Sequence, residues 1–369
     1  MERYWESREP SRRVPASSLS PWLMNLFELT RALVDVESVT ENEECIGNTL
    51  FAHLSVLAER HGGLVERMPV APKRFNVLAC WGDPVVTFST HMDTVPPFFA
   101  SREDDEYIWG RGACDTKGII AAMIFAVREL LEEGQKNIAL LFVVGEERNS
   151  AGAYAAAKNR RGSKFLINGE PTENKLAVGS KGALRLELIA SGRMAHSAYP
   201  ALGESAIEKL LDALQRVRGI ALPSDQILGQ STLNIGTIAG GRAPNVIADQ
   251  AHAEIFIRLV DDGAQTRDAL GKAAGNGVEV HEILTIPAAH LGSLPGFETT
   301  VVAYTTDIPA FGEAWGKPYL IGPGSIQVAH TAEERIPKVQ LLEAVQIYKR
   351  MAKELIRNKS ESSWNLKSQ

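Results

Sequence analysis

Short apolar runs alternate with helix-like segments through the first half of the chain, and this alternation constrains the fold more than any other feature. Residues 85–90 and 137–144 are predicted strands, and the second is continuously apolar, as expected of a strand buried on both faces. A helical pattern lies between them at residues 119–131, and a second helix (151–158) leads to a third strand (164–168). This order predicts an α/β layered domain with a mostly parallel sheet.

A different pattern begins near Lys181. Its predicted elements are a strand at residues 183–190, a helix at 204–218, strands at 232–238 and 249–259, a helix at 266–273 and a strand at 278–284. The order β-α-β-β-α-β predicts a small ferredoxin-like domain. The other predicted elements are helices at residues 21–36 and 42–60, a strand at 318–321 and a final helix at 337–356.

The chain has 369 residues, which is long for one hydrophobic core and favours two domains. We therefore predict an α/β protein in which a smaller ferredoxin-like α+β domain is inserted into a larger, mostly parallel-sheet domain. The expected parts are a flexible arm at residues 1–20, the larger domain at 21–179 and 287–359, the inserted domain at 180–286 and a disordered tail at 360–369.

Composition excludes several classes of protein. The net charge of −6, without a basic cluster containing aromatic residues, argues against nucleic-acid binding. Since no apolar run reaches the roughly 18–20 residues of a membrane span, we expect no membrane partner. The three cysteines show no metal or redox spacing, and the charged N-terminus is unlike a secretory signal. These features predict a cytoplasmic protein in a reducing compartment.

Carboxylates and histidines follow several of the apolar runs. The set consists of His91, Asp93, Asp115, Glu146, Glu147, Glu170 and His330. Because ligands of open α/β sheets bind beyond the carboxyl ends of the strands, we expect these side chains to converge. Mixed histidine and carboxylate ligands suit zinc, and cobalt or manganese could substitute. Such a set can hold two metal ions and leave one carboxylate free to move a proton.

Each member of this set also has a purely structural interpretation. His91 and Asp93 point the same way on an extended segment, so Asp93 can orient the imidazole, or the pair can simply end a strand. Asp115 could be a helix N-cap. Glu146 and Glu147 could be solvated acids at a helix start, where the dipole favours them. The joint pattern, rather than any one residue, therefore indicates a site.

Seven ordered motifs extend this pattern from about residue 87 to residue 334. They are STHMDTVPP, WGRGACDTKG, VVGEERNSAG, NGEPT, RMAHSAYP, GGRAPNVIAD and GPGSIQVAH. With them the chain resembles the zinc-dependent aminoacylase and carboxypeptidase family that includes acetylornithine deacetylase and succinyl-diaminopimelate desuccinylase. The resemblance implies a catalytic larger domain, two divalent metal ions, zinc foremost, and a homodimer formed through the inserted domain, which also acts as a lid.

The resemblance also divides the metal ligands. It implies that Asp115 bridges two metal ions, that His91 and Glu170 complete one site, and that Glu147 and His330 complete the other. A cis peptide bond is implied between Asp115 and Thr116.

The remaining roles concern the proton and the substrate. The resemblance implies that Asp93 orients the first histidine ligand and that Glu146 is the general base. It implies that His196 reaches the scissile carbonyl across a dimer interface. Asn245, Arg258, Gly324 and Ser325 are the candidate substrate-binding residues.

The expected reaction is metal-dependent hydrolysis of the amide bond of an N-acyl amino acid. Residues 304–311 look more like acetylornithine deacetylase than the desuccinylase, which favours N-acetyl-ornithine and a place in arginine or lysine biosynthesis. The alternatives are the desuccinylase, a lysine-carrier hydrolase, and a dipeptidase or carboxypeptidase of the same family. A non-catalytic binding homologue should have lost ligands that are all present here. A serine hydrolase lacks support because the chain has no G-x-S-x-G motif.

Overall fold

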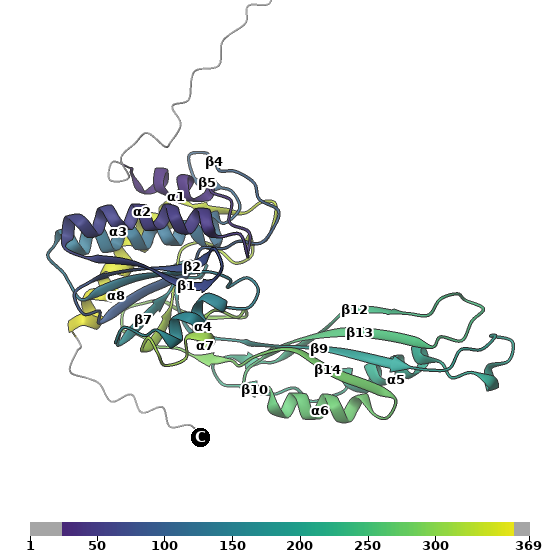
Figure 1. Ribbon diagram of the computed structural model, residues 1–369. Helices are drawn as coiled ribbons and strands as arrows, with labels where there is room; N and C mark the ends of the chain where they lie inside the picture. The colour runs from purple at the N-terminus through teal and green to yellow at the C-terminus, as the bar shows by residue number, and fades with distance from the viewer. Residues whose placement is uncertain (1–23, 358–369) are drawn as a thin grey trace, which may run out of the picture.

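The computed structural model describes residues 24–357, which form a layered unit and a second, arm-like unit that extends from it (Figure 1). The predicted N-terminal arm and C-terminal tail lie outside the described residues. The fold class is α/β, as the sequence predicts. Within residues 24–357, no helix has both the length and the apolar character needed to cross a membrane.

The larger unit is built on a mixed nine-stranded sheet whose centre is parallel. In spatial order its strands are β1 (Leu64–Ala71), β2 (Arg74–Trp81), β6 (Ile138–Val143), β3 (Val86–His91), β7 (Phe165–Asn168), β17 (Lys317–Leu320), β8 (Leu176–Ser180) and β15 (Ala289–His290), and β16 (Thr299–Val302) also pairs with β8. The four strands β6, β3, β7 and β17 run parallel to one another. β1 and β2 form an antiparallel hairpin at one edge, and β15 pairs antiparallel with β8 at the other.

Helices cover both faces of this sheet. One face packs against α1 (Leu26–Val34), α2 (Glu44–His61), α3 (Gly118–Glu132) and α8 (Lys338–Arg357), and the other against α4 (Ala151–Lys158) and the short α7 (Ile308–Phe311). Strand β6 shows why its sequence is continuously apolar. Its residues alternate between the two cores, with Leu140 in one and Leu141 in the other, because successive side chains of a strand point to opposite faces.

The first helix begins later than the periodicity alone suggests. The side chain of Asn25 accepts hydrogen bonds from the backbone N–H groups of Phe27 and Glu28, and the Glu28 carboxylate accepts the N–H of Asn25. This capping box satisfies N–H groups that have no partner within the helix, so it defines the start of α1 at Leu26. The first three residues of the predicted helix, 21–23, lie outside the described residues.

The smaller unit has the predicted β-α-β-β-α-β order. Its elements are β9 (Gly182–Ser191), α5 (Ala206–Arg218), β12 (Thr232–Gly240), β13 (Gln250–Leu259), α6 (Ala264–Ala274) and β14 (Val278–Ile286). The antiparallel strand order is β12-β13-β9-β14, and the helices share one core with one face of this sheet. The chain enters this unit at Lys181, between β8 and β9, and leaves it after β14 at Pro287.

Two small sheets contain the remaining strands of the described residues. One is the pair β10 (Ser224–Asp225) and β11 (Gly229–Gln230), and the other contains β18 (Arg335–Pro337), β5 (Tyr107–Trp109) and β4 (Arg102–Glu103). The sequence analysis did not identify these strands individually, because strands of two or three residues are too short to show a periodicity. The β18–β5 pairing joins the segment after His330 to the segment before Asp115.

Candidate metal centre

The predicted ligands gather at the carboxyl ends of the parallel strands. His91 is the last residue of β3, and Glu147 lies in the loop after β6. Glu170 follows β7 by two residues, and His330 lies in the segment after β17. Asp115 occupies a buried turn directly before α3, and its peptide bond to the next residue is cis, as the family resemblance implies.

Asp115 lies between the two histidines. Its Oδ1 is 3.0 Å from Nε2 of His91, and its Oδ2 is 3.3 Å from Nε2 of His330. His330 Nε2 is also 3.0 Å from Oε2 of Glu147. Each oxygen of one buried carboxylate therefore faces a different histidine, which is the arrangement that a ligand shared by two cations requires.

Three of these residues form a compact ligand group. His91, Asp115 and Glu147 offer ligand atoms that all lie within 4.8 Å of one another. Hydrogen bonds from His330 and His91 outweigh burial and lower the pKa of Asp115. Burial and the charge of Asp115 raise the pKa of Glu147. A group that combines imidazoles with crowded, buried carboxylates suits divalent cations, because cations offset the repulsion between the carboxylates.

Glu170 provides the clearest indication that this group fits cations. The residue is only 4% exposed, and within the described residues its Oε1 has no hydrogen-bond partner. Burial raises its pKa well above the ordinary value, with Asp115 raising it further against the opposing charge of His91. A buried carboxylate oxygen without a donor is costly, and a bound cation would supply the missing interaction.

Glu146 lies next to this ligand group and remains largely buried. Its Oε2 is 4.0 Å from Nε2 of His91, and its side chain is 15% exposed. Burial raises its pKa well above the ordinary value, against the opposing charge of His91. A carboxylate with a raised proton affinity is suited to accept and return a proton.

Asp93 orients more than the histidine. Nδ1 of His91 is 3.0 Å from the backbone oxygen of Asp93 and 3.6 Å from its carboxylate Oδ1. The carboxylate accepts the backbone N–H groups of Gly145, Glu146 and Glu147, at 2.9, 3.1 and 3.3 Å. Asp93 thus fixes the loop that carries both glutamates, in addition to its contact with the imidazole.

The candidate residues of the smaller unit lie far from this group. His196 and Asn245 are exposed in the loops β9–α5 and β12–β13, at the end of the arm remote from the large sheet (Figure 1). The Ser197 N–H donates to the backbone oxygen of Asn245 at 3.0 Å, which ties the two loops together. The Ala198 N–H donates to Nδ1 of His196 at 3.1 Å, so Nε2 carries the proton of the neutral ring.

The other three substrate candidates lie in different places. Arg258 is in β13, paired with Ala183 near the start of β9, and its guanidinium lies 4.8 Å from the ring centre of Phe256. Gly324 adopts a φ of 90°, and a Cβ there would approach the sulfur of Cys114 to 2.5 Å. The backbone oxygen of Ser325 accepts the Cys114 thiol. Gly324 and Ser325 therefore pack against the turn that carries Asp115.

Two buried acids near the centre were missed by the sequence analysis. Asp307 is buried, and burial raises its pKa to about 7, against the opposing effect of the nearby Ser150 hydroxyl. Glu334 is fully buried and accepts hydrogen bonds from the turn that contains Asp115. The only available signal for Glu334 was its position four residues after His330.

A pocket of about 120 Å³ opens beside Glu146, where the two units meet. Three segments line this pocket: the loop before α4 with the first turn of α4, the start of α7 with the residues before it, and the end of β14. The lining residues include Glu146, Ser150, Tyr154, Leu284, Ile286, Thr306 and Pro309. The smaller unit therefore supplies one wall of the space next to the candidate base.

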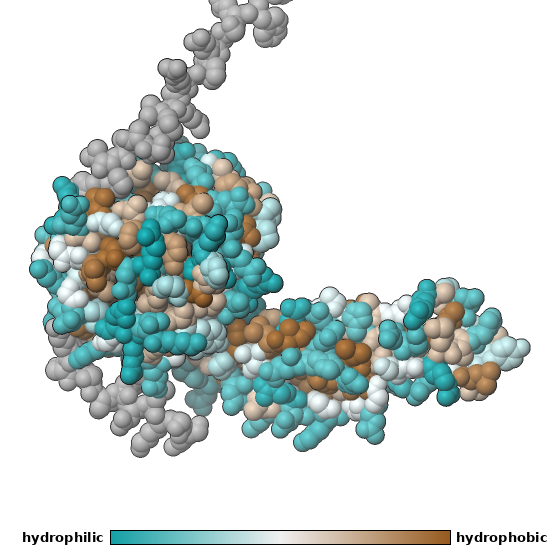
Figure 2. Space-filling model, viewed as in Figure 1, coloured by the Kyte–Doolittle hydropathy of each residue, from teal (hydrophilic) through white to brown (hydrophobic). Residues whose placement is uncertain are grey.

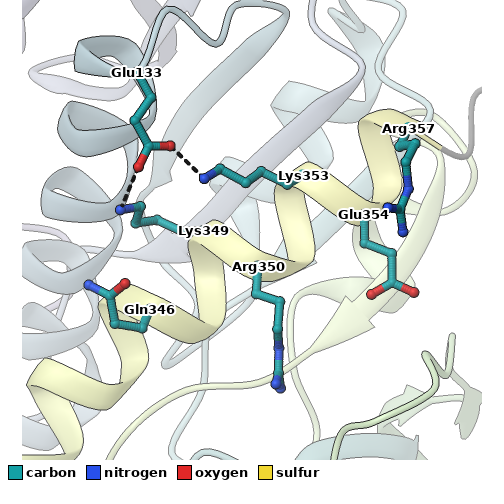
Figure 3. A pocket seen from close by; sticks show the side chains of 7 residues that line it. All are labelled: Glu133, Gln346, Lys349, Arg350, Lys353, Glu354 and Arg357. Carbon is teal, nitrogen blue, oxygen red and sulfur yellow. Dashed lines mark ion pairs between the residues drawn. The ribbon is translucent and has the colours of Figure 1, made fainter.

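A wider pocket, of about 600 Å³, runs along the outer face of α8 (Figure 3). Its lysines are already paired: Lys349 lies 3.0 Å and Lys353 lies 2.6 Å from the carboxylate of Glu133. None of the candidate ligands lines this pocket, whose charged side chains are four basic and two acidic residues of the surface.

Comparisons with known proteins agree with this geometry. The model of peptidase family M20/M25/M40 matches residues 87–354. A peptidase M20 domain-containing protein of Schizosaccharomyces pombe is 41% identical, with 90% of this chain and 86% of that protein covered. A probable carboxypeptidase of Aspergillus niger is 37% identical, with 87% of each covered.

Solved structures share the fold. The aminopeptidase PepT of Bacillus cereus gives a TM-score of 0.75 at 20% identity, covering 90% of this chain and 98% of that one. The metallo-carboxypeptidase Sso-CP2 of Sulfolobus solfataricus gives 0.72 at 15% identity, covering 90% and 99%.

Proposed function

Because this chain belongs to peptidase family M20/M25/M40 and is a metal-dependent hydrolase of that family, we propose that it is a carboxypeptidase. Its substrate would be a short peptide or N-acylated amino acid with a free carboxylate, cleaved at the last amide bond. The observation that carries the proposal is the position of Asp115 between His91 and His330. The carboxypeptidase assignment is supported by the relatives that are named probable carboxypeptidases.

In this proposal the chain holds two divalent cations. Asp115 would be the shared ligand, His91 and Glu170 would hold one cation, and Glu147 and His330 would hold the other. The buried, unpaired Oε1 of Glu170 supports its role as a ligand. Zinc is the first candidate, and cobalt or manganese are alternatives, because the ligands are a mixture of imidazoles and carboxylates.

Bound divalent cations would polarise the scissile carbonyl and make water more acidic. Glu146 then takes the proton of the attacking water and returns it to the leaving amine. Its support is its position beside the ligands and the raised proton affinity that burial gives it. Asp93 keeps Glu146 in place through the loop N–H groups that it binds.

The substrate carboxylate is assigned first to Arg258, which can bind a carboxylate through two parallel N–H groups. Asn245 is a second polar candidate. Because its loop is tied to that of His196 at the far end of the arm, it would come from a second copy, as His196 does. Gly324 and Ser325 are candidates because they pack against the turn that carries Asp115, where a glycine permits close approach to the backbone.

His196 would donate its Nε2 proton to the carbonyl oxygen as negative charge develops there. Since His196 lies at the far end of the arm, we propose that it serves the site of a second copy in a homodimer. Apolar surface along the arm supports a protein partner (Figure 2). Its exposed apolar side chains include Met194, Leu202, Leu211 and Ile238.

The hypothesis that the substrate is N-acetyl-ornithine is the weaker alternative. It rested on residues 304–311, whereas the relatives reported above carry peptidase names over most of the chain. A cytoplasmic location remains part of the proposal.

The test compares the turnover of four substrates by the protein after it has been loaded with zinc or cobalt. They are an N-blocked dipeptide with a free carboxylate, a free dipeptide, N-acetyl-ornithine and N-succinyl-diaminopimelate. We expect the blocked dipeptide to give the highest kcat/KM. A higher value for N-acetyl-ornithine would replace the carboxypeptidase assignment with the deacetylase, and a preference for the free dipeptide would indicate a dipeptidase.

A further inference from the structure

We propose that Glu334 is a positioning residue of the metal centre, which holds the turn of residues 112–115 so that Asp115 can span two cations. This inference rests on the proposed two-cation site and adds a residue to it. Glu334 itself is not a ligand in the proposal, because both of its carboxylate oxygens already accept hydrogen bonds from protein groups.

One oxygen of Glu334 binds the backbone of the turn. Oε1 accepts the N–H groups of Gly112, Cys114 and Asp115, at 2.9, 3.3 and 3.2 Å. Gly112 has a φ of 83°, a conformation that glycine adopts readily and that lets successive N–H groups converge on one anion. The turn is therefore shaped around this carboxylate.

The other oxygen of Glu334 has a different partner. Oε2 accepts Nη1 of Arg111 at 2.5 Å, and Arg111 is only 2% exposed. Arg111 also donates to the backbone oxygen of Pro97 at 3.2 Å. The arginine compensates the buried charge of Glu334, so the ion pair and the contacts to the turn are two separable functions of one side chain.

The position of Glu334 in the chain gives these contacts a consequence for the site. It lies four residues after His330 and directly before β18, which pairs with β5 ahead of the turn. The Gly110 N–H also donates to the backbone oxygen of Glu334 at 3.1 Å. Glu334 thus fixes the segment of one proposed ligand, His330, against the turn of another, Asp115.

This arrangement predicts which property changes when Glu334 is altered. His91 is fixed at the end of a central strand and does not depend on Glu334. The relative position of Asp115 and His330 does depend on it. Loss of the acceptor for the turn should therefore weaken the binding of the cation held by Asp115, Glu147 and His330 more than the binding of the other cation.

The experiment compares two double variants that differ in one acceptor. Arg111→Met/Glu334→Gln removes the ion pair but keeps a carbonyl oxygen that can accept the N–H groups of the turn. Arg111→Met/Glu334→Met removes the ion pair and the acceptor together. Replacement of a buried ion pair by side chains of similar volume is commonly tolerated.

The readout is cation binding, measured by calorimetric titration of chelator-treated protein with Zn²⁺ and by the visible spectrum with Co²⁺. We expect the Gln variant to bind two equivalents with near-native affinity. In the Met variant we expect one equivalent to bind about 10–100-fold more weakly, the usual effect of losing a group that orients a ligand. Equal affinities in the two variants would overturn the inference.

Two further variants separate positioning from stability. Trp315→Phe removes a buried hydrogen bond to the Ala156 backbone, far from the turn in sequence, and should lower Tm while both equivalents still bind. If the Met variant does not fold, Glu334→Asp provides the test, because it keeps the charge but withdraws the oxygens by one methylene. Near-native cation affinity of Glu334→Asp would contradict the inference, whereas failure of the native chain to bind any cation would overturn the proposed function instead.

Discussion

The candidate site residues of the two units differ in their burial and in how firmly hydrogen bonds hold them. In the larger unit, His91, Asp115 and Glu170 are buried, whereas half of the His330 side chain is exposed. Hydrogen bonds fix the loop that carries Glu146 and Glu147, as the four contacts of Asp93 with Thr40 and this loop illustrate. In the smaller unit, His196 and Asn245 are exposed on loops at the end of the arm. The comparison teaches that all proposed cation ligands belong to the larger unit, whereas three proposed substrate contacts, His196, Asn245 and Arg258, belong to the smaller unit.

Removal of the cations should have the largest effect, because every step assigned to the larger unit depends on them. Prolonged treatment with a strong chelator is expected to reduce turnover of the blocked dipeptide to background. Addition of Zn²⁺ or Co²⁺ should restore it, as measured by initial rates against cation concentration. Elemental analysis should show that the treated protein contains no metal. If such protein kept its activity, the larger unit would not act through bound cations.

Glu146→Gln should have the next largest effect. The amide keeps the size of the side chain but cannot carry the proton, so we expect kcat to fall by about 10²–10⁴-fold, the usual contribution of a general base. KM and cation content should stay close to native. Steady-state kinetics combined with metal analysis checks this, and near-normal turnover with both cations bound would assign the proton to another group.

His196→Ala tests the contribution of the smaller unit to turnover. Loss of one donor to the developing oxyanion typically costs about 10²–10³-fold in kcat. Cation binding should be unchanged, since His196 lies outside the larger unit.

Mixing of inactive chains then tests whether His196 acts across a dimer. A dimer of one Glu146→Gln chain and one His196→Ala chain would contain one site with both residues intact. We therefore expect activity to reappear when the two variants are unfolded together and refolded. No recovery in a mixture shown to form mixed dimers would place His196 in its own chain's site.

The sequence could predict much of the larger unit because its site follows strand ends. The continuously apolar strand before Glu146 indicates burial on both faces, and parallel strands bring their carboxyl ends to one edge, so convergence of His91, Glu147 and Glu170 could be expected. The ferredoxin-like order of the smaller unit was equally readable, because its strands and helices are long enough to show their periods.

Other features depend on contacts that no local pattern contains. The role of Glu334 depends on the return of its segment to the turn of Asp115, more than 200 residues earlier. The orienting role of Asp93 was predicted for the imidazole, yet most of its hydrogen bonds go to the loop after β6. The distance between the tip of the arm and the ligands likewise follows from the tertiary arrangement and not from the motif that contains His196.

Arg258→Lys should have a smaller effect, confined to substrate binding. Lysine keeps the charge but loses the paired N–H groups of the guanidinium. Loss of one hydrogen bond between charged groups, about 1.5 kcal/mol, corresponds to a rise in KM of about tenfold. The rise should occur for substrates with a free carboxylate and disappear for the corresponding amides, and an equal effect on both would show that Arg258 does not bind the carboxylate.

Asn25→Ala should have the smallest effect. It shows how kcat and cation affinity respond to a small loss of stability of the larger unit. Asn25 caps α1 through N–H groups of its first turn, and loss of such a cap costs about 1 kcal/mol of stability. Thermal unfolding should show a small decrease in Tm, and Asn25→Asp, which keeps an acceptor oxygen, should show less. Because the cap makes no contact with the ligands in the described structure, kcat and cation affinity should not change. A change in either would mean that the metal centre responds to general loosening of the larger unit, and the effects at Glu334 would then have to be judged against that response.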